Sequence, residues 1–387
     1  MLGRRLNNTR IVFVTTNLCW GGSEELWSRT AQYLAIDGFS VSASIGFSPS
    51  HNRIKELAKH GIDIHSRPTQ YPFMRRALAK LSSSDKSLVD NDIQGFLDTR
   101  QPALVVISDG LGMLGSVEIL DFLFQKKIPF VTLSQLQGEI FWPNDEQADL
   151  YRRTLVSARR CYFVSEANRR LFEKQIGCEL SNAEVVCNPF NVDFNASPQW
   201  PPFGADGVLR LANVARLEPL MKGQDLLLEA LAGSAWRNRN WQLNFYGEGP
   251  MKNCIERMVQ NFQLQDRVHF AGFVNSIEQI WAKNHVLVMP SRYEGMPLAI
   301  VEAMLCARPV VATNVAGHSE IIEDGLTGFL ADAPTAMSVR GALDRMWERR
   351  IEIEVMGKAA AISVRKHVPS NPVHTFAEKI SGLMSMA

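Results

Sequence analysis

The chain has 387 residues, 46% of them hydrophobic and 21% charged, a composition typical of a globular protein and a length that predicts two domains. Its 41 basic residues are balanced by 40 acidic ones, so the net charge is +1 and no basic field is available for binding a nucleic acid. No segment contains the roughly 18 consecutive apolar residues that a membrane-spanning helix needs.

The amino-terminal segment, MLGRRLNNTRIVFVTTN, has a short basic stretch followed by only a few apolar residues. It predicts a first β-strand rather than a signal peptide, whose apolar stretch would be longer. The cysteines form no CxxC pair and no zinc-finger spacing with histidines, and we expect them to be buried, reduced thiols of a cytosolic protein. They are Cys19, Cys161, Cys178, Cys187, Cys254 and Cys306.

Short apolar, β-branched runs alternate with amphipathic stretches of helix length through the first half, which is typical of a parallel sheet covered by helices. The pattern predicts helices at 23–36, 113–125 and 145–158. It predicts strands at 10–16, 40–46, 62–66, 103–108, 129–133, 160–164 and 184–187.

Residues 71–81, YPFMRRALAKL, depart from this alternation. Arg75, Arg76 and Lys80 stand among apolar residues in this segment. It is therefore either a basic amphipathic helix that makes weak peripheral contact with an anionic membrane surface, or a plain solvated helix.

The periodicity stops within NPFNVDFNASPQWPPFGADG, which is rich in proline, asparagine and glycine and predicts a linker over 191–207. A second alternating series follows, with strands at 208–214, 241–246, 268–271, 285–289, 310–313 and 328–330. We therefore predict an α/β protein of two Rossmann-like, doubly wound domains whose strand ends face each other across a cleft. The domains are 1–190 and 208–365, and a helix at 366–387 packs back toward the first.

Two glycines, Gly21 and Gly22, separate the first predicted strand from the first helix. Paired glycines there leave room for phosphate or sugar at the amino end of a helix, and a plain turn is the alternative. The spacing is not that of the GxGxxG dinucleotide fingerprint, which argues against an NAD enzyme.

Two basic residues, Arg216 and Lys222, follow the first strand of the second series. They can neutralise a diphosphate, arginine with a planar fork and lysine as a mobile point charge, whereas each alone could equally be a solvated surface cation. Later strand ends carry Gly247, where backbone approaches either a ligand or the neighbouring loop, and Phe273 and Val274, which either contact a nucleobase or pack.

The strongest local signal is SRYEGMPLAIVEAMLCARPVV at 291–311. Glu294 and Glu302 are eight positions apart, slightly more than two helical turns, so that both can face one cleft. Gly295 admits a close ligand, and the free amides at the start of the following helix suit an anion. The carboxylates could accept hydroxyls from a hexose and a ribose, or they could merely share a solvated helix face.

Together these residues resemble the family 4 retaining glycosyltransferases of glycosyltransferase group 1, over essentially the whole chain. The motifs ARLEPLMKGQDLLLEAL, FYGEGP, PSRYEGMPLAIVEAMLCARPVVAT and GHSEIIEDGLTGFL follow in the family's order, and GGSEE and VVCNPFNVD support the resemblance earlier. It implies the GT-B fold and transfer of a hexose from a nucleoside-diphosphate sugar, a UDP-sugar being favoured over a GDP-sugar. The acceptor is an unidentified hydroxyl of a sugar, a lipid-linked or a small molecule.

The resemblance also implies roles for the matching residues. Arg216 and Lys222 bind the diphosphate, Glu302 holds the ribose, and Gly21 and Gly22 line the junction of donor and acceptor. No metal or other cofactor is expected, because the two cations and the helix dipoles take the place of a metal ion. The resemblance also implies that the leaving phosphate oxygen helps to deprotonate the acceptor hydroxyl. The transferred sugar is held by Glu294 and the backbone of Gly295, Met296, Pro297 and Leu298.

One position departs from the family. Many relatives have a histidine after the fifth strand of the first domain, where this chain has Ser134 and Gln135. Gln135 can donate a hydrogen bond to a sugar hydroxyl but cannot act as a base. Asp109 follows the neighbouring strand, and we place all three residues on the acceptor side, with turn capping as the alternative for Asp109.

Two other hypotheses stay open. A UDP-sugar epimerase or hydrolase of the same fold would need carboxylates and a histidine to abstract a proton beside the anomeric carbon, and the sequence offers no such set. A catalytically inactive sugar-nucleotide-binding protein is favoured by Ser134 and Gln135, and it is disfavoured by the cations and glutamates of the second domain.

Overall fold

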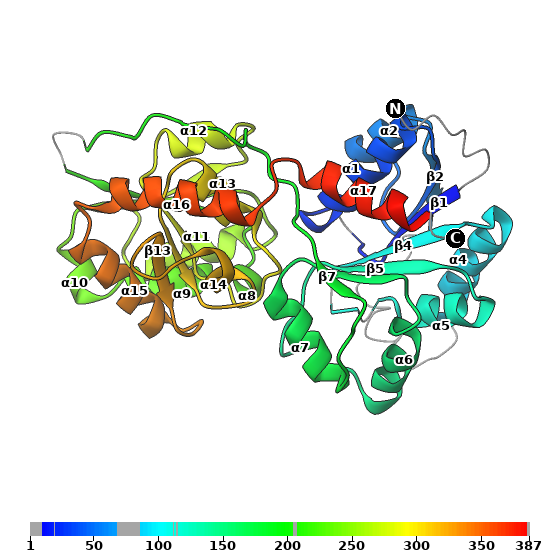
Figure 1. Cartoon of the computed structure of the whole chain (residues 1–387). Coiled ribbons are helices and arrows are strands. Elements are labelled where there is room, and N and C mark those ends of the chain that lie inside the picture. The colour runs from blue at the N-terminus through cyan, green and yellow to red at the C-terminus, as the bar shows by residue number, and fades with distance from the viewer. Residues whose placement is uncertain are drawn as a thin grey trace. The chain divides into compact units, whose positions relative to one another are not determined.

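The computed structural model describes residues 10–18, 20–67, 86–110, 112–113, 115–203 and 207–384, with the backbone alone for 86–91. The chain forms two compact units, Met1–Pro189 with Asn371–Ala387, and Phe190–Ser370 (Figure 1). The chain thus passes into the second unit once and returns to the first near its end. The segment 71–81, for which a membrane-surface or a solvated helix was predicted, lies outside the described residues.

The first unit contains a seven-stranded parallel sheet in the order β3-β2-β1-β4-β5-β6-β7. The chain starts in the middle of the sheet, moves to one edge, returns beside β1 and then moves to the other edge, which is the doubly wound arrangement. The strands are β1 (Arg10–Thr15), β2 (Ser40–Ile45), β3 (Asp63–Ser66), β4 (Leu104–Asp109), β5 (Phe130–Ser134), β6 (Arg160–Phe163) and β7 (Ala183–Val185).

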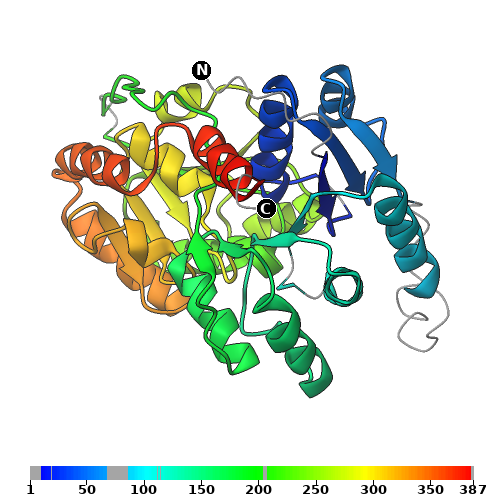
Figure 2. The same ribbon diagram turned by 45° about the vertical axis from the view of Figure 1, so that its right-hand side comes forward.

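The helices of the first unit include the last one of the chain, as the sequence predicted. The views in Figures 1 and 2 agree that this helix lies along the first, and the ring of His374 meets that of Tyr33 edge-on at 5.4 Å. The ring of Phe376 packs edge-on against Tyr162 of β6 at 5.1 Å. The helices are α1 (Ser23–Ile36), α2 (Asn52–Lys59), α4 (Lys86–Arg100), α5 (Val117–Lys126), α6 (Asp145–Leu155), α7 (Glu166–Ile176) and α17 (Pro372–Met384).

The second unit repeats this plan with a six-stranded parallel sheet in the order β10-β9-β8-β11-β12-β13. Its strands are β8 (Leu209–Val214), β9 (Trp241–Tyr246), β10 (Val268–Gly272), β11 (Val286–Met289), β12 (Val310–Thr313) and β13 (Gly328–Ala331). Its helices are α8 (Pro219–Lys222), α9 (Gln224–Leu231), α10 (Ser234–Arg237), α11 (Lys252–Asn261), α12 (Ile277–Trp281), α13 (Leu298–Leu305), α14 (His318–Ile321), α15 (Ala336–Glu348) and α16 (Ile353–His367).

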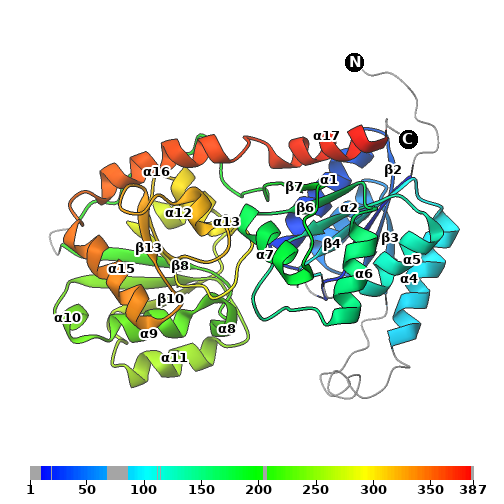
Figure 3. The same ribbon diagram turned by 60° about the horizontal axis from the view of Figure 1, so that its bottom comes forward.

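Helices cover both faces of this second sheet. Figure 3 shows α9 and α11 on one face and α12, α13 and α16 on the other. Alternate residues of β8 and β9, among them Leu211, Trp241 and Phe245, enter a large apolar core on the α9 and α11 side. The prediction of two doubly wound α/β domains is confirmed. Within the first sheet β1 lies beside β4, and within the second sheet β8 lies beside β11, so the loops that follow each pair are neighbours.

Two local predictions are wrong. The helix predicted from residue 113 begins at Val117, because Met113 has a left-handed backbone (φ 63°) and its amide donates to Asp109 Oδ1, which places Met113 in a turn. The expectation of buried thiols holds for Cys161 and Cys306 but fails for Cys254, which is exposed. In the described part of the chain, no helix is long and apolar enough to cross a membrane.

Candidate active site

The candidate site of the second unit is centred on an ion pair between two of the predicted residues. Lys222, at the end of α8, donates from Nζ to Glu294 Oε1 at 2.7 Å, and the hydroxyl of Ser291 donates to the same oxygen at 2.8 Å. Glu294 is only 5% exposed. The two residues meet because their loops follow β8 and β11, which are neighbours at the point where the strand order reverses.

Local contacts fix these two loops against each other. Gly223 has a left-handed backbone (φ 66°), and a Cβ there would collide with the carbonyl oxygen of Pro290, so only glycine fits. Arg292 makes a bidentate pair with Asp225 at 2.8 and 2.7 Å and donates to the carbonyl oxygen of Pro219 at 2.7 Å. The loop after β11 is thereby tied to α8 and α9, and Lys222 is held beside Glu294.

Arg216 lies at the start of the same β8 loop, but its side chain is half exposed. Its Nε is 3.5 Å from Glu218 Oε2, with 51% of the arginine side chain exposed. An exposed pair of this length contributes little stability, so a phosphate could displace the glutamate at small cost. The backbone at this position is fixed, since the carbonyl oxygen of Arg216 accepts a 2.8 Å bond from Gln224 Nε2.

The amino end of α13 has no side-chain cap. Pro297 is the N-cap residue, with φ −73° and ψ 121°, and the amides of the first turn, including Leu298, therefore point out of the helix without a capping side chain. Gly295 and Pro297 are buried, whereas Met296 and Leu298 are partly exposed. This end of the helix carries the positive end of its dipole and is suited to an anion, and its role in binding the donor stays a prediction.

Glu302 lies on α13 and is buried. Its Oε1 accepts bonds from the backbone amide of Asn191 at 2.8 Å and from Asn191 Nδ2 at 3.2 Å. Asn191 is not among the residues that the sequence predicted for the site. It lies within the motif VVCNPFNVD, which supported only the family resemblance.

His318 is a second residue that the sequence analysis missed. It is fully buried, its Nδ1 lies 2.6 Å from the carbonyl oxygen of Thr313, and its Nε2 has no hydrogen-bond partner among the described residues. Burial lowers its pKa, and the nearby Glu294 opposes this while Lys222 adds to it, so the ring is neutral. Because a carbonyl oxygen only accepts hydrogen bonds, Nδ1 carries the proton. Nε2 is therefore an acceptor in the neighbourhood of the Lys222–Glu294 pair.

The glycines of YGEGP are explained by the neighbouring loop. Gly247 has φ 127°, and a Cβ there would strike the carbonyl oxygen of Ala215, while a Cβ at Gly249 would strike the backbone of Leu217. A role for Gly247 in donor binding stays a prediction. Phe273 is 71% exposed, so its ring does not pack in the core of the unit, and Val274 is partly buried.

In the first unit, Gly21 and Gly22 are exposed at the amino end of α1, and Gly22 is its N-cap residue. Beneath them Glu24 is fully buried and accepts bonds from Asn17 Nδ2 at 2.7 Å and from Thr15 Oγ1 at 3.1 Å. Burial raises the pKa of Glu24, although these hydrogen bonds act in the opposite direction. The sequence analysis did not single out this carboxyl group, which anchors the glycine turn to β1.

The acceptor-side residues lie at the ends of β4 and β5. Asp109 is buried, with its two oxygens bonded to Thr16 Oγ1 at 2.9 Å and to the Met113 amide at 3.0 Å, which is the geometry of a turn cap. Gln135 Oε1 accepts a 2.8 Å bond from Asn188 Nδ2.

The polar groups at this edge of the first sheet have unused hydrogen-bonding capacity. Among the residues that the structure describes, no partner is found for the buried hydroxyl of Ser134 or for the buried Nε2 of Gln135. Gln137, which was not predicted, is 2% exposed, and neither its Oε1 nor its Nε2 has a partner in the same part of the chain. A buried polar atom without a partner raises the free energy of the folded state, so a ligand that supplies hydrogen bonds here would be stabilised.

Within the described residues, no group of three or more His, Cys, Asp or Glu side chains is arranged to hold a metal ion.

Comparison with known proteins finds a family resemblance in the second unit. Residues 205–362 match the model of the family "Glycosyl transferases group 1". The alpha-D-kanosaminyltransferase of Streptomyces kanamyceticus is 32% identical over 142 residues, which are 36% of this chain and 37% of that protein. The poly(ribitol-phosphate) alpha-N-acetylglucosaminyltransferase of Staphylococcus aureus (strain COL) is 31% identical over 123 residues, 32% of this chain and 25% of the relative. The chain therefore spans well under half the length of these curated relatives.

Solved structures resemble the whole chain. Anabaena HepE in complex with UDP and glucose has a TM-score of 0.73 at 20% identity, covering 98% of this chain and 100% of that one. Sucrose-phosphate synthase from Thermosynechococcus elongatus has a TM-score of 0.73 at 17% identity, with the same coverage of 98% and 100%. The likeness confirms the GT-B fold, and the family match confirms the resemblance to group 1, while assignment to family 4 stays a prediction.

Proposed function

We propose that this chain, whose residues 205–362 belong to the group 1 glycosyl transferases, moves a sugar from a nucleoside-diphosphate sugar to a hydroxyl group of an acceptor. The observation that carries the proposal is the Lys222–Glu294 pair at 2.7 Å, next to the uncapped amino end of α13. A cation and a buried carboxylate, next to the positively polarised amino end of a helix at one strand-order reversal, match two parts of such a donor: the negatively charged diphosphate and the hydroxyls of the sugar.

The diphosphate would lie between Lys222, Arg216 and the first-turn amides of α13. When the bond to the sugar breaks, negative charge grows on the leaving phosphate, and a preorganised cation and helix end stabilise that charge more than they stabilise the bound donor. Lys222 is suited to this task because Glu294 and the Gly223 turn hold it in place before substrate binds.

Glu294 would position the transferred sugar, and Glu302 the ribose. A carboxylate can accept several hydrogen bonds, so Glu294 can take sugar hydroxyls while it keeps Lys222 and Ser291. Because Glu294 is paired with a cation, we assign it to positioning and not to covalent attack. We infer a retaining reaction without a metal, in which the leaving phosphate oxygen takes the proton of the acceptor hydroxyl.

A UDP-hexose is the donor that we propose, with a GDP-sugar as the alternative. Anabaena HepE, which shares the fold, was crystallised with UDP-glucose, and a relative from Escherichia coli is named as a UDP-Gal transferase acting on a diphosphoundecaprenol acceptor. On the acceptor side, Ser134, Gln135 and Gln137 offer buried neutral groups, which suits the hydroxyls of a sugar or another polyol. The free cysteines Cys161 and Cys306 agree with a cytosolic location.

The test is the release of nucleotide from a panel of UDP-, GDP- and ADP-sugars, with Lys222→Ala beside a matched control. Lys358→Ala removes a lysine that is 66% exposed on α16 and is paired with Glu354. We expect wild type and the control to release nucleotide equally, and Lys222→Ala to be slower by about 10²–10³-fold. A changed sugar released without transfer would instead identify an epimerase, and no release from any donor would identify a binding protein.

A further inference from the structure

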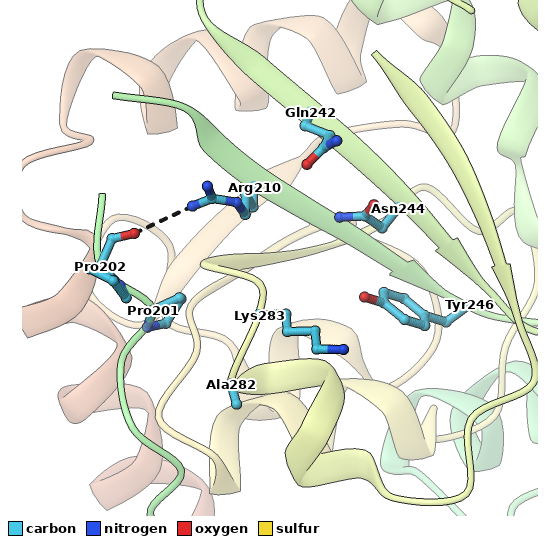
Figure 4. Close-up of a pocket in the computed structure, with 8 residues that line it drawn as sticks. All are labelled: Pro201, Pro202, Arg210, Gln242, Asn244, Tyr246, Ala282 and Lys283. Atoms are coloured by element: carbon cyan, nitrogen blue, oxygen red, sulfur yellow. Dashed lines mark hydrogen bonds between the residues drawn. The ribbon is translucent and has the colours of Figure 1, made fainter. Parts of the chain in front are cut away.

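Polar side chains that face a cavity in the second unit already have partners within the protein. Figure 4 shows Arg210 bonded to the carbonyl oxygen of Pro202, at a distance of 3.3 Å. Two other residues of the cavity wall, Asn244 and Tyr246, are bonded to the amide of Asn284 at 2.8 and 2.9 Å. The first unit differs, because several buried polar groups around the end of β5 lack such partners in the described part of the chain.

Six buried polar atoms around the end of β5 have no hydrogen-bond partner among the residues that the structure describes. Their five side chains are all uncharged, and none is more than 9% exposed. Native proteins leave few buried polar atoms unpaired, so this concentration indicates a place where a ligand supplies hydrogen bonds. The atoms are Ser134 Oγ, Gln135 Nε2, Gln137 Oε1 and Nε2, Gln175 Oε1 and Asn188 Oδ1.

Three of these amides are held around the β5–α6 loop, residues 135–144, by one half of each group. Asn188 Nδ2 donates to Gln135 Oε1 at 2.8 Å, and Gln175 Nε2, on α7, donates to the carbonyl oxygen of Gly138 at 2.9 Å. The other half of each amide is the unpaired one. The amides are therefore fixed in orientation before a ligand binds, and they offer both donors and acceptors.

Gln137 is the amide of this group that uses neither half within the described residues. It lies beside the turn at Gly112, where a Cβ would come within 2.9 Å of Gln137 Oε1 and 2.7 Å of Phe141 Cβ. The Gly112 amide donates to the carbonyl oxygen of Leu136 at 3.1 Å, so the turn and the loop are joined. A buried amide without partners raises the free energy of the folded state, and a ligand would remove this cost.

The outer part of the same loop exposes apolar side chains. Trp142 is 53% exposed and Ile140 is 57% exposed, which reverses the usual distribution of apolar groups inside and polar groups outside. A tight turn, closed by a 3.0 Å bond from the Phe141 amide to the Gly138 carbonyl oxygen, brings the chain at Trp142 back toward Gln137. The loop thus presents an aromatic ring and unpaired amides close to each other.

A carbohydrate matches both features of the loop. A pyranose has hydroxyl groups around its edge, which bond to amides, and an apolar C–H face, which packs on an aromatic ring. A lipid chain would match Trp142 but would leave the amides unpaired. A sugar phosphate would find no cation within the unpaired group, whose side chains are all uncharged.

We propose that the β5–α6 loop binds a neutral saccharide of at least two sugar units as the acceptor, an inference that rests on the proposed function. The sugar that receives the transferred unit bonds to Gln135, Gln137 and the unpaired atoms beside them. The next sugar of the chain packs its C–H face on Trp142. Gln137 and Trp142 therefore determine which acceptor is bound and take no part in the chemical step.

The test is isothermal titration of the full chain, with and without saturating UDP, against neutral disaccharides of glucose, galactose and mannose and the matching monosaccharides. We expect at least one disaccharide to bind more tightly than its monosaccharide. Trp142→Ala should weaken that disaccharide by about threefold to tenfold and leave the monosaccharide unchanged, because only the second sugar lies on the ring. Phe124→Ala, which removes an aromatic ring that is 37% exposed on α5 of the same unit, should change neither affinity.

Gln137→Met separates a binding role from a structural one. Methionine has nearly the volume of glutamine but no amide, so it removes two unpaired atoms from the interior. We expect both saccharides to bind about fivefold more weakly, while the urea concentration at the unfolding midpoint does not fall. A lower midpoint with unchanged saccharide binding would show that the amide serves the fold, and it would overturn the proposal.

Two further measurements separate this inference from a lipid site and from the proposed function. If farnesyl phosphate in detergent micelles binds and loses affinity in Trp142→Ala, or if no disaccharide binds more tightly than its monosaccharide, the inference is wrong. Nucleotide release by wild type, measured without an acceptor, reports on the donor chemistry alone. Release without saccharide binding would overturn only the acceptor site, whereas saccharide binding that depends on Trp142, without any release, would support that site and contradict the proposed function.

Discussion

Replacing Lys222 with alanine perturbs both the stability of the second unit and the proposed reaction. The ion pair spans 2.7 Å, with 7% of the Glu294 side chain and 26% of the Lys222 side chain exposed. Breaking a fully buried pair costs about 3–5 kcal/mol and breaking an exposed one about 0–1 kcal/mol. The partial exposure of Lys222, and the bond that Ser291 keeps to the same oxygen, place the expected cost at about 1–2 kcal/mol of unfolding free energy.

The effect on turnover should exceed the effect on stability. The alanine removes a fixed positive charge from the position where the leaving diphosphate gains negative charge, which corresponds to about 10²–10³-fold in kcat, or about 2.7–4 kcal/mol. Initial rates of nucleotide release and urea unfolding curves of the same preparations measure the two quantities side by side. Lys358→Ala supplies the baseline for loss of a surface lysine.

A particular combination of results would refute this reasoning. If Lys222→Ala unfolds at lower urea, yet its turnover stays within about threefold of wild type, then the pair only holds the loops together and the diphosphate binds elsewhere. Glu294→Gln and the double variant complete a mutant cycle. A coupling energy close to zero in kcat would show that the two side chains do not act on one substrate.

Four further outcomes are expected. Arg216→Ala should lower kcat by about 10²–10³-fold, whereas Glu302→Ala should chiefly raise the Kd for the nucleotide, both measured by kinetics and titration; an unchanged kcat in the arginine variant would contradict the diphosphate assignment. Turnover should survive EDTA, and loss of activity that manganese restores would overturn the metal-free proposal. Gln135→Ala should slow transfer but leave nucleotide affinity unchanged, and Gln135→His should be tolerated; normal turnover of the alanine variant would remove this region from the acceptor side. Burial lowers the pKa of His285 to about 4 from 6.5, so the unfolded state binds more protons between these values, and the unfolding free energy should fall by up to about 3 kcal/mol as the pH drops from 6.5 to 4. His285→Gln should lack this part of the pH dependence in thermal unfolding, and an identical slope in both proteins would show that the ring does not titrate as described.

Much of the fold could be predicted because the sequence pattern is local. Apolar runs of strand length alternate with helical stretches in both halves, and each strand order follows from the doubly wound rule. The rule also predicts that loops after β8 and β11 meet, which is why Lys222 and Glu294 could be assigned to one site. The turn at Met113 was missed since it depends on the left-handed backbone of that residue, which is rare for a residue with a side chain.

The contacts within the site could not be predicted, because they depend on distant partners. The direct bond between Lys222 and Glu294 requires Gly223 to press against Pro290, a contact that no periodicity encodes. The bond from Asn191 to Glu302 joins residues 111 positions apart. His318 lies within GHSEIIEDGLTGFL, which supported the resemblance to the family, but no role was assigned to it because a lone histidine after a glycine is as often a core residue as a functional one.

Two asparagines mark the ends of the first of the two chain segments that join the units. Asn188 is bonded to Gln135 of the first unit and Asn191 to Glu302 of the second, so only Pro189 and Phe190 stand between the two anchor points. The proline ring also fixes one of the few backbone angles in this tether. Gln135 and Glu302 are themselves predicted to bind substrate. A ligand that displaces either asparagine would lengthen the segment between the two anchor points. The residues predicted to bind the substrates would then also affect how far the units can move at this crossing.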